Sequence, residues 1–267
     1  MKHPGKPGAS GTLPLEPIFM KKLSVILLMF MLTCWCGSCA RPRVVVPEAA
    51  VPAAEPGCDI SQLPTELSRC ENELARDSAE RTNCLTNIAR LAFFLGELSP
   101  QNEKQQYFEK GERHAGILAR EQPAWAEGHY WLALNLCGLA ELSGPRQGLS
   151  LVPKIVEELE QALKVNPGYD QAGPHRVLGR IYFECPHWPL SVGNIHDSLE
   201  HLTSAVALAP DNSTNHLFLA ETLLKLGKKE EARHELEQVL RATRHAMCPQ
   251  NLQEDRQTAR RLLQQNW

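Results

Sequence analysis

Small and branched apolar residues recur at helical spacing in the second half of the chain, in units that close with a glycine or a proline. The clearest unit, Ser213–Ala246, covers 34 residues, which is the period of a tetratricopeptide (TPR) repeat. Gly227 separates its two halves, as expected of a residue that ends a helix. The apolar positions that would face each other in this helix pair are Leu219, Ala220, Leu223, Ala232, Leu236 and Val239.

Three earlier stretches fit the same template with longer turns, and the first of them is the least regular. Each closes on a proline that follows an alanine or a leucine by five residues. The pattern therefore predicts a series of antiparallel helix pairs. The matching positions are Gly111, Ala115, Leu118 and Pro123; Leu132, Ala133, Leu136, Ile155, Leu159, Ala162 and Pro167; and Leu178, Gly179, Tyr182, Ser198, Leu202, Ala205 and Pro210.

We expect residues 60–267 to form an all-α, TPR-like helical-repeat solenoid of antiparallel helix pairs. Asn251–Gln264 is predicted to be a C-terminal capping helix. Tyr182–His196 and Ala140–Leu151 are predicted to be insertions between paired helices. The low aromatic content, 6%, also favours packed helices over a sheet, because sheets are enriched in aromatic and β-branched residues.

A segment near the N-terminus, residues 20–40, has the pattern of an export signal. Met20 and two lysines precede the apolar run Leu23–Trp35, which is too short to span a bilayer comfortably. Small residues around Cys39 resemble a bacterial lipobox, so Cys39 is the predicted lipidation site, with cleavage after Ala40 as the alternative. We expect residues 1–19 to be a non-native leader, 20–39 a lipoprotein signal peptide and 40–59 a Pro/Ala-rich tether. The predicted location is the periplasmic face of the envelope, with the outer membrane preferred.

Charge, cysteine usage and motifs restrict the chemistry. The net charge of −3 gives no reason to expect the basic stripe that a nucleic acid needs.

If residues 61–75 and 80–98 form a helical hairpin, Cys70 and Cys84 lie opposite each other, and a disulfide or two buried thiols are equally consistent with the sequence. Cys185, His187, His196 and His201 lack metal-ligand spacing, so surface histidines and no metal or cofactor are expected. The motifs of hydrolases and phosphate-binding enzymes are missing, so we expect no enzyme.

Further motifs occur in Gly111–Ala119, Tyr130–Ala133 and Gly179–Gly193, the last with a Trp-Pro-x-Ser-x-Gly insertion. These segments resemble the TatT family, the T-components of tripartite ATP-independent periplasmic (TRAP) transporters, and Asn215–Leu223 is also similar. Asn194 departs from the family's pattern, where an Asp is expected. The resemblance implies a periplasmic lipoprotein that binds the transporter's solute-binding protein, can form a homo-oligomer, and passes on a small organic or hydrophobic ligand. The alternative from the residues alone is a generic TPR lipoprotein scaffold for envelope assembly or secretion.

The candidate partner or ligand surface follows from these segments. Trp188, between two prolines, either lies exposed on a recognition loop or fills the groove between repeats. Tyr130 and Trp131 open a helix and could line a groove, but adjacent helical residues point about 100° apart, so we expect only one of them to be buried in the core. The full set of candidate residues is Tyr130, Trp131, Arg180, Tyr182, His187, Trp188, Asn194 and Asn215.

Overall fold

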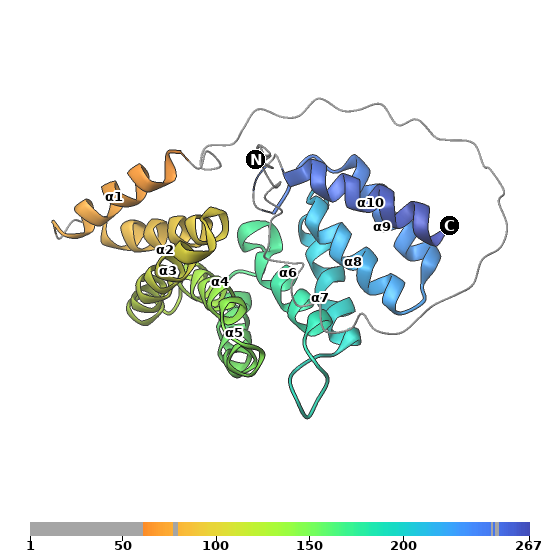
Figure 1. The fold of residues 1–267 in the computed structure, drawn as a ribbon, viewed down its shortest axis with the longest axis horizontal. Helices are drawn as coiled ribbons and strands as arrows, with labels where there is room; N and C mark the ends of the chain where they lie inside the picture. Colours follow the sequence, from red (N-terminus) through yellow and green to blue (C-terminus); the bar gives the residue numbers. More distant parts are fainter. Residues whose placement is uncertain (1–60, 77–79, 247, 249–250) are drawn as a thin grey trace, which may run out of the picture.

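The computed structural model describes residues 61–76, 80–246, 248 and 251–267, and this part of the chain contains ten helices and no strand. Consecutive helices pack antiparallel and stack side by side, from α1–α3 at one end to α8–α10 at the other (Figure 1). The predicted all-α helical-repeat fold is therefore confirmed. The helices are α1 (Leu63–Leu74), α2 (Arg81–Leu98), α3 (Gln101–Glu121), α4 (Ala126–Leu142), α5 (Pro145–Val165), α6 (Tyr169–Glu184), α7 (Ile195–Leu208), α8 (Ser213–Lys225), α9 (Lys229–Arg241) and α10 (Leu252–Asn266).

The apolar positions of the repeat pattern form two main cores. One joins α2–α6, and the other joins α7–α10. The two cores meet where α6 crosses α7, because a Cβ on Gly179 would lie 2.5 Å from Leu202 Cγ. Only a glycine at this position lets the two helices approach so closely. A third, smaller cluster holds α1 against α2.

The two predicted insertions turn out differently. Within the predicted insertion Tyr182–His196, residues 185–194 form a loop between α6 and α7, whereas Tyr182–Glu184 end α6 and Ile195–His196 begin α7. The segment Ala140–Leu151 is instead helical almost throughout, because α4 runs to Leu142 and α5 begins at Pro145. Pro145 lies in the first turn of α5, where its missing N–H costs nothing, so the extra residues lengthen both helices. The expected capping helix is present as α10, which packs on α8 and α9.

Tyr130 and Trp131 are both buried, with exposed fractions of 1% and 3%, so the expectation that only one would be buried is wrong. Helix α4 packs against α2, α3, α5 and α6, and it is therefore enclosed on nearly every side. The expectation assumed a helix with one face exposed to solvent, on which neighbouring residues differ in burial. Over its first three turns α4 has almost no exposed face, so both residues are buried.

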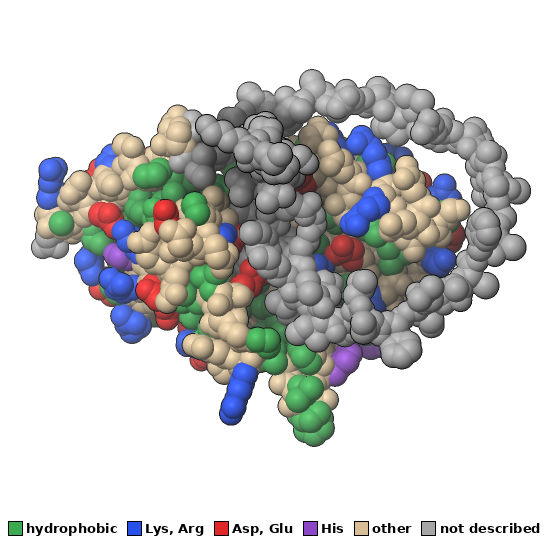
Figure 2. Space-filling model, in the orientation of Figure 1, with side chains coloured by type: hydrophobic (Ala, Val, Ile, Leu, Met, Phe, Trp, Pro, Cys, Tyr) green, Lys and Arg blue, Asp and Glu red, His purple; other side chains and the backbone are tan. Residues whose placement is uncertain are grey.

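Several predictions concern residues at or beyond the edge of the described part. Cys39, the leader, the signal peptide and the tether all lie outside the described residues. Cys70 and Cys84 are buried and form no disulfide, which is the alternative that the sequence left open, and Cys84 Sγ lies 3.7 Å from Glu73 Oε2. Among the described helices, none is both long and apolar enough to cross a membrane. Lysines and arginines are interspersed with acidic residues on the face seen in Figure 2.

Candidate functional site

The first turn of α6 has an unusual backbone. Asp170, Gln171 and Ala172 all have positive φ angles, of 48°, 55° and 64°. Each such residue costs an L-amino acid about 1–2 kcal/mol. Three in succession, none of them glycine, persist only where their surroundings hold them in place.

The spacing of residues along the sequence explains why this turn exists. In two of the helix pairs a histidine follows the closing proline by six residues: His129 after Pro123, and His216 after Pro210. In the middle pair His175 follows Pro167 by eight residues. The two extra residues are accommodated at the entrance to α6, and the left-handed turn lies there.

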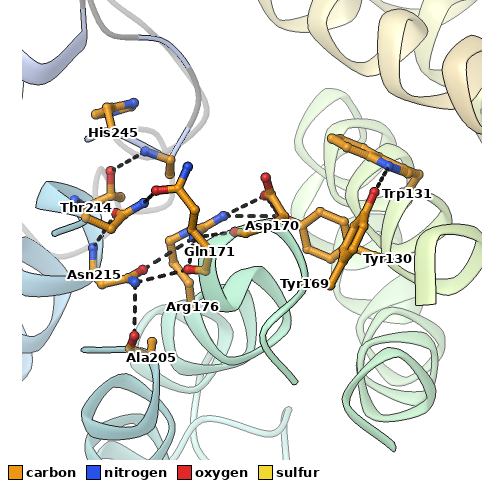
Figure 3. A network of polar contacts seen from close by, with 12 residues as sticks. Tyr130, Trp131, Tyr169, Asp170, Gln171, Arg176, Ala205, Thr214, Asn215 and His245 are labelled. Atoms are coloured by element: carbon orange, nitrogen blue, oxygen red, sulfur yellow. Dashed lines mark hydrogen bonds and ion pairs between the residues drawn. The ribbon is translucent and has the colours of Figure 1, made fainter. Parts of the chain in front are cut away.

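Arg176 holds the turn from within (Figure 3). Its Nη1 donates to the carbonyl oxygens of Asp170 and Gln171, at 3.2 and 3.1 Å, and its Nη2 donates to Asp170 Oδ2 at 2.9 Å. The same guanidinium reaches Tyr130 Oη of α4 at 3.2 Å and Asn215 Oδ1 of α8 at 3.4 Å. Arg176 is 5% exposed, so one buried cation links the first helices of three successive pairs. We call these five residues the Arg176 network.

The acidic and aromatic members of this region have perturbed pKa values. Burial raises the pKa of Asp170, and the Arg176 guanidinium and the Tyr130 hydroxyl, which donates to Asp170 Oδ2, oppose the shift. Burial also raises the pKa of Tyr130, as does the adjacent Asp170 carboxylate. Trp131 Nε1 donates to Tyr169 Oη at 2.9 Å, next to these groups. Burial raises the pKa of Tyr169 as well, so both tyrosines stay protonated, and each hydroxyl takes part in the packing of α4 against α6.

Helix α8 completes the network from the other side. Asn215 Nδ2 donates to Gln171 O and to Ala205 O, at 3.2 and 3.1 Å. Asn212, the N-cap of α8, donates from Nδ2 to Gln171 Oε1 at 2.9 Å. The carbonyl groups of Asp170 and Gln171 thus both have donors from buried side chains.

Arg180 lies one helical turn after Arg176 and forms a separate, partly exposed cluster. It pairs with Glu184 of its own helix and with Glu221 of α8, both at 2.5 Å. Its guanidinium also lies over the ring of Phe218, 4.7 Å from the centroid. Beside it, Lys225 Nζ lies 4.2 Å from the Phe183 ring centroid and donates to the Phe183 carbonyl.

Tyr182 belongs to a third group, between α6 and α7. Its ring stacks on His201, whose Nδ1 lies 3.0 Å from His175 Nδ1. Burial lowers the pKa of both histidines, and in His175 the neighbouring imidazole lowers it further. The prediction that His201 is a surface histidine is therefore wrong, because it is half-buried against a second histidine.

The loop between α6 and α7 projects from the helical stack (Figures 1 and 2). Trp188 and Leu190 at its tip are 86% and 76% exposed. Trp188 therefore fills no groove, and the alternative in which it lies exposed describes the structure. His187 and Asn194 serve the loop itself: His187 Nδ1 donates to Gly193 O at 2.7 Å, and the Asn194 side chain caps α7.

The eight candidate residues thus separate into four places. Tyr130 and Asn215 meet in the Arg176 network, Trp131 lies beside it, and Arg180 and Tyr182 belong to separate clusters on α6. The other three candidates, His187, Trp188 and Asn194, lie in the loop. Sequence reasoning missed Arg176 and Asp170, although the eight-residue interval between Pro167 and His175 marked the irregularity.

The fold and these clusters define a TPR-like helical-repeat protein in which polar side chains tie neighbouring helix pairs together. A crystal structure of a thermophilic TPR protein from Thermus thermophilus has the same fold, with a TM-score of 0.56 and 19% sequence identity. The match covers 75% of this chain and 91% of that chain. At this identity the likeness concerns the fold alone.

The family is shown by a second comparison. The model of the family "Regulator of microtubule dynamics protein 1-3" matches residues 65–265, and the chain belongs to this family. A similar curated relative is regulator of microtubule dynamics protein 3 from Bos taurus, 27% identical over 179 residues. That alignment covers 61% of this chain and 37% of the relative, so the chain matches little more than a third of the relative's length.

The family match overturns the predicted resemblance to TatT proteins. Four predictions that depended on this resemblance or on the export signal are therefore wrong. They are the TRAP-transporter function, the solute-binding-protein partner, the envelope-scaffold alternative and the lipid-anchored periplasmic location. The residues that suggested TatT are mostly packing positions: Gly111, Gly179 and Ala133 allow close helix contacts in any helical repeat. Such positions define a fold that many functions share.

Proposed function

We propose that this chain is a non-catalytic protein-binding module that regulates microtubule dynamics. The observation that carries the proposal is the family match over residues 65–265, which coincides with the stack from α1 to α10. A stack of helix pairs presents an extended surface that suits a protein partner.

The internal chemistry of the chain supports binding rather than catalysis. The polar cluster that joins three helix pairs, the Arg176 network, is closed to solvent, since Arg176 and Tyr130 are 5% and 1% exposed. These groups are satisfied by one another and by backbone carbonyls, and they set how α4, α6 and α8 lie together. A catalytic group must instead reach its substrate.

The test uses the purified full chain and microtubules grown from purified tubulin. We expect the chain to co-sediment with microtubules and to change growth rate or catastrophe frequency in a dose-dependent way, as seen by fluorescence microscopy. The heat-unfolded chain is the control for nonspecific effects. No co-sedimentation and unchanged dynamics at the highest soluble concentration would exclude the proposal.

A salt titration adds information on the contact. Exposed ion pairs weaken as ionic strength rises, whereas apolar contacts do not. The face seen in Figure 2 mixes both signs of charge, and the net charge is −3. We therefore expect binding that persists as salt is raised, and a steep loss of binding would point to a purely electrostatic contact.

A further inference from the structure

The loop Cys185–Asn194 combines strong exposure with a lack of charge. Its ten residues include no Asp, Glu, Lys or Arg. Trp188 and Leu190 at the tip are 86% and 76% exposed, whereas the next most exposed large apolar residue of the described part, Leu208, is 50% exposed. Two large apolar side chains two residues apart, both held this far into solvent, are the arrangement expected of a contact surface.

The loop is held in shape by its own hydrogen bonds. Gly193 N donates to Pro186 O and Leu190 N donates to His187 O, at 2.9 and 3.1 Å. At the base, Asn194 N donates to Tyr182 O at 2.9 Å. Gly193 packs against the other side of the loop, where an added Cβ would lie 2.0 Å from Cys185 O. A loop ordered in advance loses little conformational entropy when it binds.

The shape of the loop suits insertion rather than flat contact. It extends beyond the neighbouring helices as a narrow projection with an apolar end (Figures 1 and 2). A single tryptophan at the end of such a projection resembles the central anchor of a protein interface, which fills a pocket on the partner.

We propose that Trp188 and Leu190 form an anchor that enters an apolar pocket on the protein partner. This inference rests on the proposed function, under which that partner is the microtubule. A bilayer is less suited, because basic residues beside an apolar insertion strengthen attraction to anionic lipids, and this loop has no Lys or Arg. The cation at its base, Lys225, already donates to the Phe183 carbonyl.

The test compares Trp188→Ala with the matched variant Trp125→Ala in the full chain. Trp125 is also exposed, at 40%, but it precedes α4 and lies outside the loop. Trp188→Ala should keep the wild-type thermal midpoint, because its side chain is 86% exposed. The Trp125 side chain is more covered, so both variants are compared at a temperature at which circular dichroism shows them fully folded. We expect Trp188→Ala to weaken co-sedimentation with microtubules at least about tenfold and Trp125→Ala to leave it unchanged. Leu190→Ala should give a smaller loss.

Each other outcome overturns the anchor in a different way. If the wild type binds and Trp188→Ala binds equally well, the anchor is refuted while the proposed function stands. If the wild type does not bind microtubules, both the proposed function and the anchor are refuted. Sedimentation with vesicles of phosphatidylcholine and phosphatidylserine supplies the remaining arm: Trp188-dependent binding to vesicles, without loss of microtubule binding, assigns the tip to a membrane and refutes a protein pocket.

Discussion

Replacing Arg176 with methionine should destabilise the fold strongly. Methionine keeps most of the apolar stem but removes every hydrogen bond of the guanidinium. The carboxylate of Asp170 would then lose its cation, and breaking a buried ion pair in this way costs about 3–5 kcal/mol. The Asp170 side chain is 25% exposed, so water screens part of the charge and the lower end of this range applies. Two carbonyls of the left-handed turn also lose a donor, which adds about 1 kcal/mol.

A second substitution separates the charge from the lost hydrogen bonds. Asp170→Asn in the Arg176→Met background removes the unpaired carboxylate, and asparagine tolerates a positive φ, so the turn is not further strained. We expect the double variant to recover about 1–2 kcal/mol of the loss. Arg233→Met is the matched control, because Arg233 is half exposed and its pair with Glu237 contributes at most about 0.5 kcal/mol.

The assay is urea unfolding of the full-length variants, followed by far-UV circular dichroism near neutral pH. The change in the free energy of unfolding is read from the shift in midpoint at constant slope. A loss of less than about 1 kcal/mol in Arg176→Met, or no recovery in the double variant, would refute the view that Arg176 holds the turn.

Three further outcomes follow from the structure. Gly193→Ala should lower the free energy of unfolding by about 1–3 kcal/mol, because the added Cβ would meet backbone atoms. Gly116→Ala is the control: this helical position has room for a Cβ, so the substitution should raise the thermal midpoint slightly where Gly193→Ala lowers it. Gly227→Ala should cost about 1 kcal/mol in urea unfolding, because Gly227 has a φ of +75°. The folded-state pKa values of His175 and His201 lie below the unfolded value, so their contribution to stability is present above about pH 6.5 and is lost as pH falls. His201→Phe should make urea midpoints less dependent on pH between neutral and acidic conditions, and an unchanged dependence would contradict the assignment.

The regular part of the fold could be predicted because it follows from local periodicity. Gly227 marks the turn of the last pair, and Leu236 and Val239 lie in the core that the pattern predicted. Those positions depend only on which face of a helix is apolar. The burial of Tyr130 and Trp131 together depends on how many neighbours α4 has, and that information is spread over the whole chain.

The candidate site was harder to predict for a physical reason. Arg176 and Asp170 interact through a turn whose backbone no propensity favours, and Arg176 reaches Tyr130 from 46 residues away. The family assignment failed because most of the matched residues report helix packing, and the matched insertion around Trp188 is a short loop that does not identify a family. The Trp188 loop is the exception, because its prolines, its glycine and its lack of charge were visible in the sequence. The sequence did not show whether the loop points into solvent or packs between the repeats.

One sequence change accounts for two features of the middle helix pair. In the flanking pairs the histidine ring bridges two groups: His129 contacts Pro123 O and Glu158, and His216 contacts Pro210 O and Glu235. With two more residues before it, His175 instead contacts His201. The inserted residues form the left-handed turn that Arg176 holds, so the strained backbone and the paired imidazoles have a common origin. The helix pair joined by these imidazoles should therefore lose stability as pH falls. His216 differs, because its hydrogen bonds to Glu235 and to Pro210 O outweigh burial and raise its pKa, so its protonated ring favours the folded state in acid.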